Sequence, residues 1–338
     1  MSGTIDTVDE RDLIGRLHAR AGHRPASVVL GIGDDAALLE PVRGELIVLS
    51  TDSLVEDVHF RRHLTSPSDI GRKALAVNLS DLAAMGASPR ACLLGLALPS
   101  GLPLDDFDQL IAGLVTLAEA VGVPLVGGNL ARSPGPLVVD VTVVGSVHRR
   151  RVLRRAGGLP GDDLYVTGTL GGAAAGLRRL EAGLDRQTAS VAELAVVGRH
   201  ERPDARIRTG RAVARQAAAR AAIDLSDGLA AAVSQLAEAS GVGAVIDLDL
   251  IPVDPGLLEA SPAPSGDAPA LALRGGEDYE LLFAVPPRRR RTFEAAVRRA
   301  GETRATRIGR LTAERALRVA EGGMERPLPA PDFAHFGQ

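Results

Sequence analysis

The feature that most constrains the fold is the run ELIVLSTD at residues 45–52, which is apolar until it ends on two hydroxyls and a carboxylate. A short run of leucine and β-branched residues bounded by polar residues is typical of a buried strand. We therefore predict a buried strand here. Its last residues, Ser50, Thr51 and Asp52, should emerge together at one edge of a sheet as oxygen ligands.

Two further groups of oxygen donors flank this strand in the sequence. The segment GIGDD at residues 31–35 has two glycines that permit a tight turn, which would aim the carboxylates of Asp34 and Asp35 in one direction. Asp81 lies downstream in a largely apolar segment. Hard oxygen donors from a turn, a strand and a helix suit Mg²⁺, which prefers carboxylates together with water and substrate phosphates. The sequence therefore predicts a phosphate site that holds several Mg²⁺ ions.

The segment around Asp81 has the signals of a helix from Pro67 to about Met85. Ser66 can cap it and Pro67 suits its first position. The segment is apolar nearly all round, which predicts a buried helix. In such a helix Asn78 and Asp81 need partners, because an unpaired buried carboxylate is costly. We favour a metal ligand at Asp81 over a hydrogen bond that only supports a neighbouring ligand.

The rest of the chain alternates between expected strands and helices. Strands are expected at 91–98 and 138–147, and a third at 124–129 should turn sharply at Gly127 and Gly128. After a basic connector at 148–155, the sequence predicts a strand at 163–167 and a helix at 171–180.

Acidic residues recur twice in the second half of the chain. Asp224 and Asp227 flank a serine where a short strand meets a helix. Asp227 could simply cap that helix, whereas metal binding is the simplest explanation for Asp224. The segment GGEDYELLF at 275–283 places further acidic side chains at the start of an apolar strand.

Composition excludes several classes of protein. A chain of 338 residues exceeds what one hydrophobic core usually serves, so we expect two domains, at 1–148 and 149–338. Aromatic residues make up 2% and the net charge is -3, which argues against nucleic-acid binding. No apolar run is long enough to cross a membrane. Cys92 is the one cysteine and the chain starts without a signal-peptide core, so we expect a cytoplasmic protein.

Six sequence blocks resemble the thiamine-monophosphate kinase family. They occur in the family's order and span nearly the whole chain: GIGDDAA at 31–37, STD at 50–52, VHF at 58–60, KALAVNLSDLAAMGA at 73–87, DLSDG at 224–228 and GGEDYEL at 275–281. Several are shared with the wider superfamily of aminoimidazole ribonucleotide synthetase. The blocks at 73–87 and 275–281 look specific to the thiamine branch.

The resemblance implies a fold and an activity. The fold is a two-domain α/β fold like that of aminoimidazole ribonucleotide synthetase. Its N-terminal domain binds ATP and Mg²⁺ and pairs into a β-barrel shared across a homodimer, and its C-terminal domain completes the active site. The activity is in-line, Mg²⁺-assisted transfer of a phosphoryl group from ATP to thiamine monophosphate, the last step of thiamine diphosphate biosynthesis.

The resemblance also assigns roles to individual residues. The expected Mg²⁺ ligands are Asp35, Ser50, Thr51, Asp52, Asp81, Asn129, Asp224 and Asp227. The residues expected to hold ATP are Gly128, Asn129, Arg155 and Ser226, and those expected to touch thiamine monophosphate are His59, Glu277 and Phe333. No residue is assigned as a general base, because the acceptor is a phosphate oxygen that is already ionised.

One position departs from the family pattern. The family has Gly-Gly-Asp where this chain has Gly127, Gly128 and Asn129. An asparagine can still offer a carbonyl oxygen to Mg²⁺ but removes one negative charge, so we expect a weaker metal site with activity retained. Two alternatives stay open. One is another ATP-dependent enzyme of the superfamily, and the other is a nucleotide-binding regulator whose turnover is impaired because of Asn129.

Overall fold

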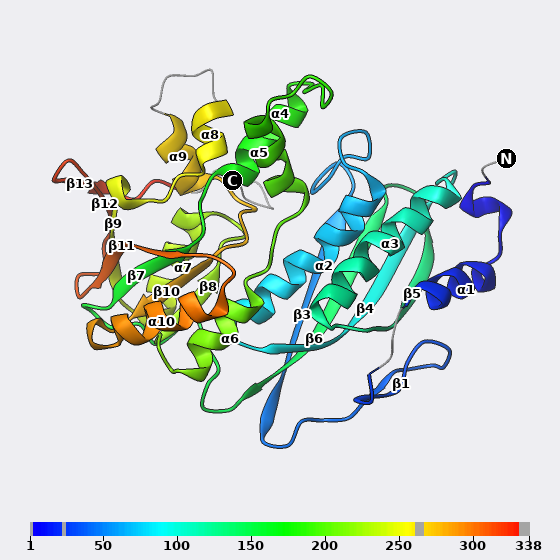
Figure 1. Cartoon of the computed structure of the whole chain (residues 1–338), viewed down its shortest axis with the longest axis horizontal. Helices are drawn as coiled ribbons and strands as arrows, with labels where there is room; N and C mark the ends of the chain where they lie inside the picture. Colours follow the sequence, from blue (N-terminus) through cyan, green and yellow to red (C-terminus); the bar gives the residue numbers. More distant parts are fainter. Residues whose placement is uncertain (1–2, 22–24, 261–266, 331–338) are drawn as a thin grey trace. The chain divides into compact units, whose positions relative to one another are not determined.

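The chain folds into two compact units. The computed structural model describes residues 3–21, 25–260 and 267–330. Unit 1 comprises the described residues up to Leu82 together with Ser88–Arg149 (Figure 1). Unit 2 comprises Ala83–Ala87 and the described residues from Arg150 onward. The chain therefore passes between the units at residues 82–83, 87–88 and 149–150.

Unit 1 is built on a four-stranded sheet with the strand order β3-β6-β4-β5, and a separate two-stranded hairpin is formed by β1 and β2. Strands β4 and β5 pair in parallel and the other pairs are antiparallel. The elements are η1 (Ile5–Thr7), α1 (Glu10–Arg20), β1 (Val28–Leu30), β2 (Leu38–Leu39), β3 (Glu45–Val55), α2 (Pro67–Ala84, whose last two residues belong to unit 2), β4 (Ser88–Pro99), α3 (Leu104–Val121), β5 (Leu125–Ser133) and β6 (Val138–His148).

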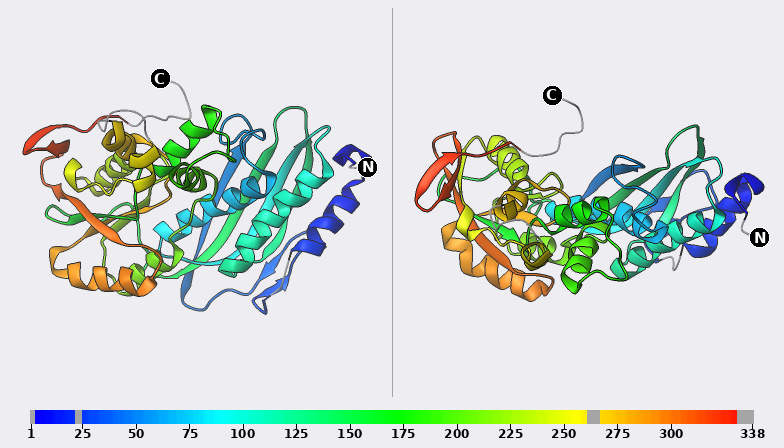
Figure 2. Two further views of the ribbon diagram at one scale, coloured as in Figure 1. Left: turned by 45° about the horizontal axis from the view of Figure 1, so that its top comes forward. Right: turned by 90° about the horizontal axis from the view of Figure 1, so that it is seen from above.

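Helices α2 and α3 lie side by side on one face of this sheet (Figure 2). The predicted N-terminus of α2 is confirmed: the backbone N–H of Asp69 donates to Ser66 Oγ at 3.1 Å, which satisfies one of the free N–H groups of the first turn. The two helices approach through Gly71, where a Cβ atom would lie 1.9 Å from the carbonyl oxygen of Leu110. Because no larger residue fits at Gly71, the two helices can pack closely against each other.

Strand β3 differs from the buried strand expected from its sequence. It lies at the edge of the sheet and pairs with β6 alone. Its side chains alternate, so Ile47 and Leu49 are each 67% exposed. An apolar run cannot tell a strand buried on both faces from one with a single covered face, which is why the prediction was wrong.

The predicted end of this strand was also wrong, because β3 continues to Val55. Ser50, Thr51 and Asp52 therefore lie within the strand and alternate between its two faces. Ser50 and Asp52 share the helix-covered face with buried Leu54, whereas Thr51 lies on the other, open face. The three oxygen donors thus do not emerge together.

The glycine pair on β5 is not a sharp turn, contrary to expectation, since β5 runs through it from Leu125 to Ser133. The strand instead shifts register here against β4, between Cys92 and Leu93. Gly128 has a φ of 157°, and a Cβ atom there would lie 1.9 Å from the carbonyl oxygen of Leu94. The glycine pair therefore allows a close backbone approach to the neighbouring strand β4.

Unit 2 has a seven-stranded sheet with the order β13-β12-β9-β11-β7-β10-β8, in which only β12 and β9 pair in parallel among the described residues. Its elements are β7 (Asp163–Thr167), α4 (Gly172–Glu181), α5 (Val191–Glu201), α6 (Ile207–Arg215), β8 (Ala221–Asp224), α7 (Leu229–Ser240), β9 (Gly243–Asp247), η2 (Leu248–Leu250), α8 (Pro255–Ala260), α9 (Asp267–Arg274), β10 (Leu281–Val285), η3 (Pro287–Arg289), α10 (Arg290–Ala300), β11 (Ala305–Thr312), β12 (Leu317–Glu321) and β13 (Met324–Pro327).

The core of unit 2 lies on both faces of its sheet. Leu229, Val233 and Leu236 of α7 pack with apolar residues of β7, β8 and β10 in one cluster. On α10, the ring of Phe293 lies 4.9 Å from Tyr165 and 5.2 Å from Phe283, centroid to centroid. Helices therefore cover the sheet on its two sides, as apolar strands buried on both faces require.

Cys92 is fully buried, and burial raises the pKa of its thiol to about 12, which fits a small inert core residue. Across the part of the chain that the structure describes, every helix is too short or too polar to span a membrane.

Candidate functional site

Polar side chains tie β3 to α2 on the helix-covered face of the unit 1 sheet. Ser50 Oγ donates to Asp81 Oδ2. The backbone N–H of Asp52 donates to Asn78 Oδ1 at 3.0 Å, and Asn78 Nδ2 donates to the carbonyl oxygen of Ala74 at 2.9 Å. The expected partners of Asn78 and Asp81 are thus found. Asn78 is fully buried with its amide engaged by backbone, so it positions β3, whereas half-buried Asp81 keeps a carboxylate beside Ser50.

A second polar group lies on the open face of the same sheet. Thr51 Oγ1 donates to Asp140 Oδ1 at 3.3 Å, and Ser53 Oγ donates to Asp140 Oδ2. Thr51 Oγ1 also lies 3.0 Å from Thr142 Oγ1. Asp140 was not among the predicted site residues, although it is a carboxylate within the apolar strand expected at 138–147.

Asp35 and His59 occupy loops of unit 1. Asp35 is exposed in the turn between β1 and β2, and its backbone N–H donates to Asp34 Oδ1 at 2.8 Å. His59 follows β3, and its Nδ1 accepts the backbone N–H of Val55 at 3.0 Å. Because Nδ1 is an acceptor, the neutral imidazole carries its proton on Nε2.

The two acidic motifs of unit 2, at residues 224–228 and 275–281, lie side by side. Asp224 pairs with Leu281 between β8 and β10. The backbone N–H of Glu277 donates to the carbonyl oxygen of Ser226 at 2.7 Å. Segments far apart in the sequence thus bring together Asp224, Ser226, Asp227 and Glu277. Asp227 is not the cap of α7, because Gly228 occupies the N-cap position with a φ of 91°.

The backbone of residues 277–279 is held in an unusual conformation. Glu277 and Tyr279 have positive φ angles of 68° and 49°, which non-glycine residues rarely adopt. Between them Asp278 is buried and accepts the backbone N–H groups of Gly171 at 2.7 Å and Ala173 at 3.2 Å, at the start of α4. Burial raises the pKa of Asp278 to about 7. Asp278 therefore anchors the segment of residues 277–279, whose strained backbone carries the Glu277 side chain.

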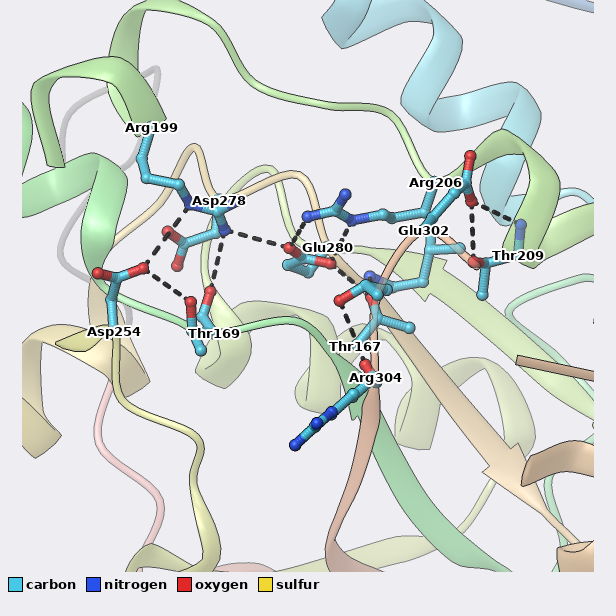
Figure 3. Close-up of polar contacts among 12 residues, drawn as sticks. Thr167, Thr169, Arg199, Arg206, Thr209, Asp254, Asp278, Glu280, Glu302 and Arg304 are labelled. Carbon is cyan, nitrogen blue, oxygen red and sulfur yellow. Dashed lines mark hydrogen bonds and ion pairs between the residues drawn. The ribbon is translucent and has the colours of Figure 1, made fainter. Parts of the chain in front are cut away.

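Glu280 lies at the centre of a buried ion network (Figure 3). Its carboxylate accepts two hydrogen bonds from Arg206, one of them from Nε at 2.7 Å. Arg199 Nη2 at 3.1 Å and Thr167 Oγ1 at 2.7 Å donate to it as well. Burial acts to raise the pKa of Glu280, but the hydrogen bonds and charges of Arg206 and Arg199 outweigh it and lower the pKa. Glu280 is therefore a structural residue, because its carboxylate oxygens already accept these hydrogen bonds.

Two further predicted site residues are Arg155 and Phe333. Exposed Arg155 donates from Nη1 to Gln235 Oε1 at 2.9 Å. Phe333 lies outside the described residues. His200 was not predicted, yet its Nδ1 lies 3.0 Å from Glu277 Oε2. Within residues 3–21, 25–260 and 267–330, no three His, Cys, Asp or Glu side chains cluster closely enough to hold a metal ion by themselves.

Comparison with known proteins assigns the family. Residues 33–147 match the model of the AIR synthase related protein N-terminal domain, and residues 160–321 match that of its C-terminal domain. The chain is 38% identical to the thiamine-monophosphate kinase of Salmonella typhimurium, in an alignment that covers 97% of this chain and 98% of that protein. The chain belongs to the thiamine-monophosphate kinase family.

Solved structures of thiamine-monophosphate kinases have the same fold. The enzyme of Stenotrophomonas maltophilia is 40% identical, with a TM-score of 0.82 over 94% of this chain and 97% of that chain. AaThiL complexed with AMPPCP and TMP is 31% identical, with a TM-score of 0.77 over 99% of this chain and 100% of that chain. The two-domain α/β fold implied by the sequence blocks is therefore confirmed.

Proposed function

We propose that this chain transfers the γ-phosphoryl group of ATP to thiamine monophosphate, giving thiamine diphosphate and ADP. The observation that carries the proposal is the likeness, over nearly the full length, to a family member whose structure contains both AMPPCP, an ATP analogue, and TMP. The sequence blocks at 73–87 and 275–281 support the same substrate. A reaction that consumes ATP also fits the cytoplasmic location expected from the sequence.

The residue set fits a reaction between two polyanions. Phosphoryl transfer needs positioning and charge neutralisation more than covalent chemistry, and the acceptor phosphate needs no general base. Carboxylates and hydroxyls are the donors that Mg²⁺ prefers. In unit 1, Ser50, Asp52 and Asp81 form one such group and Asp35 adds an exposed carboxylate. In unit 2, Asp224 and Asp227 form another. When bound, Mg²⁺ would neutralise the negative charge of the phosphates and would align the attacking oxygen with the leaving oxygen.

The protein's own side chains would orient the two substrates. Gly128, Asn129, Arg155 and Ser226 are proposed to hold ATP, with the Arg155 guanidinium adding a positive charge beside the phosphates. Glu277, His59 and Phe333 are proposed to touch thiamine monophosphate. His200 would hold the Glu277 carboxylate in place through their 3.0 Å contact, so that the strained segment presents it in one orientation.

The assay that tests this function is direct. Purified protein with ATP, thiamine monophosphate and Mg²⁺ should form thiamine diphosphate, and a chelator should stop the reaction. Nucleotide binding without formation of thiamine diphosphate would instead favour the alternative of a nucleotide-binding regulator. ATP turnover only with another small phosphate or amide would favour a different enzyme of the superfamily.

We propose further that the chain is a homodimer that pairs through the open face of β3. Ile47 and Leu49 expose apolar side chains on that face. Elsewhere on the sheet, Val28 of the β1–β2 hairpin packs on Ala91 and Val126. Exposed apolar side chains grouped on one edge strand favour a protein partner. The resemblance to the family makes that partner a second copy, which would close a shared barrel.

Substituting Leu49→Asp should convert this dimer to a monomer, because it places a charge in an apolar contact. Sedimentation or light scattering would measure the mass. The matched control is Val191→Asp, since Val191 is 86% exposed on α5 and should leave the mass unchanged. A monomeric parent protein, or a dimer that survives the Leu49 substitution, would contradict the proposed interface.

A further inference from the structure

Arginines line a cavity in unit 2 between helices α6 and α10, which lie side by side (Figure 1). The cavity has a volume of about 430 Å³. Four arginines line it: Arg208, Arg211 and Arg215 from α6, and Arg299 from α10. None of the described residues that line it is among those assigned above to ATP, Mg²⁺ or thiamine monophosphate. The cavity is therefore a feature that the proposed kinase reaction does not use.

The two helices that form the cavity are held in place by packing and by a hydrogen bond. Thr209 and Val213 of α6 are fully buried, and so is Phe293 of α10, which packs against rings of the sheet. Glu302, two residues after the end of α10, accepts the backbone N–H of Thr209 at 2.7 Å, in the first turn of α6. The walls of the cavity are therefore fixed before any ligand binds.

The charges on α6 are arranged in a way that costs stability. Arg208, Arg211 and Arg215 follow one another at spacings of three and four residues. Such spacings place the side chains in one row along the helix, where neighbouring like charges repel. Arg208 also lies in the first turn, where the partial positive charge of a helix N-terminus disfavours a cation. Departures from local rules of this kind are expected mainly at functional sites. A bound anion would offset the repulsion.

Acidic side chains offset only part of this charge. Arg208 Nε lies 3.3 Å from Glu302 Oε1. No aspartate or glutamate is among the described residues that line the cavity. Arg215 and Arg299 are exposed, come from opposite walls, and make no ion pair or hydrogen bond within the part of the chain that the structure describes. These two guanidinium groups are therefore available to a ligand.

The lining favours a chain of phosphates as that ligand. Guanidinium groups bind phosphate oxygens through paired, charge-assisted hydrogen bonds. Seven residues separate Arg208 from Arg215, so the row extends about 10 Å along the helix, enough for two or more linked phosphate groups. The other lining residues are small or uncharged and leave the space between the arginines open: Ala212, Gln216, Ala296 and Ala300.

The same lining argues against recognition of a base or of a nucleic acid. No aromatic ring is among the described residues that line the cavity, so a base or a thiamine ring has no side chain there on which to stack. The net charge of the chain is -3, whereas nucleic-acid-binding domains are usually basic. The phosphate groups of a small molecule are therefore what the cavity would recognise.

We propose that the cavity between α6 and α10 binds a diphosphate or a longer phosphate chain, either inorganic or carried by a nucleotide or by thiamine diphosphate. The four arginines supply the positive charge, so this binding needs no Mg²⁺. Unit 2 would then hold a second anion site, separate from the acidic motifs at 224–228 and 275–281.

Calorimetric titration of the full-length protein with inorganic pyrophosphate in EDTA tests the proposal, because the acidic kinase site would need Mg²⁺ to bind phosphates. The parent protein should bind pyrophosphate. The double variant Arg215→Gln with Arg299→Gln removes one cation from each wall and should weaken binding by at least about tenfold. Both side chains are exposed, so the variant should stay folded by circular dichroism. The matched control is Arg298→Gln, at an exposed position of α10 outside the cavity lining, which should bind like the parent.

Parallel titrations with ADP and with thiamine diphosphate identify the source of the phosphates. Equal, arginine-dependent binding of all three compounds would show that the phosphate chain alone is sufficient, and tighter binding of one would identify it as the occupant. A parent that binds none of them in EDTA, or a double variant that binds as tightly as the parent, would overturn the proposal. Equal weakening by Arg298→Gln would also overturn it, because it would show a general attraction to surface charge. None of these outcomes depends on turnover of thiamine monophosphate.

Discussion

Substituting Asp81→Asn should lower kcat for thiamine diphosphate formation on the order of 10²–10³-fold, the range seen when one group that stabilises transition-state charge is removed. The substitution keeps the volume of the side chain and an oxygen that can accept the Ser50 hydroxyl. It removes the negative charge that would hold Mg²⁺ between the two phosphates. Product formation at saturating ATP, followed over a range of Mg²⁺ concentrations, measures the effect.

The control for this prediction separates loss of metal binding from loss of structure. Asp105→Asn removes a carboxylate from an exposed position of α3 in the same unit and should leave kcat unchanged. Circular dichroism should show both variants folded. An Asp81→Asn enzyme with near-parental kcat and the same Mg²⁺ dependence would contradict the assignment of Asp81 as a ligand.

Substituting Glu280→Gln should destabilise the protein by about 3–5 kcal/mol, the usual cost of removing one partner of a buried ion pair. The reason is that Arg206, which is 8% exposed, would keep its charge but lose the carboxylate to which it is hydrogen-bonded. Urea unfolding measures the change in free energy. Glu314→Gln removes an exposed carboxylate paired with Arg318 and should cost less than about 1 kcal/mol.

The same network predicts a pH dependence. The pKa of Glu280 in the folded protein is lowered from 4.5, so folding favours its charged form. Its contribution to the free energy of unfolding is therefore present above pH 4.5 and is lost as pH falls through the folded-state pKa. The difference in stability between the parent and Glu280→Gln should shrink as the pH is lowered from neutrality to below 4.5. A difference that stays constant would show that the charge is not what stabilises the network.

Local signals were sufficient for much of the fold. The predicted start of α2 is confirmed, because capping at Ser66 and proline at the first position act within one turn of a helix. The predicted strand 163–167 coincides with β7. The family could be recognised from short sequence blocks, because this recognition depends on the residue types and on the order of the blocks along the chain. It does not depend on which blocks are in contact in the folded protein.

Pairing between distant segments could not be read from such local signals. The apolar run at 45–52 predicts a strand, but only the sheet order makes β3 an edge strand with Ile47 and Leu49 exposed. The motifs at 224–228 and 275–281 were each seen as acidic, and only the pairing of β8 with β10 makes them neighbours. His200 beside Glu277 gave no sequence signal, since a lone histidine on a helix is usually structural.

The sequence by itself determined which oxygen donors the chain carries, where its helices begin and to which family it belongs, because these depend on residue type and on spacing within a few residues. The tertiary structure alone decided which donors share a face. Side chains alternate along a strand, so Ser50 and Asp52 point one way and Thr51 the other. The register between strands, which depends on contacts far apart in the chain, then places Asp140 in the same row as Asn129.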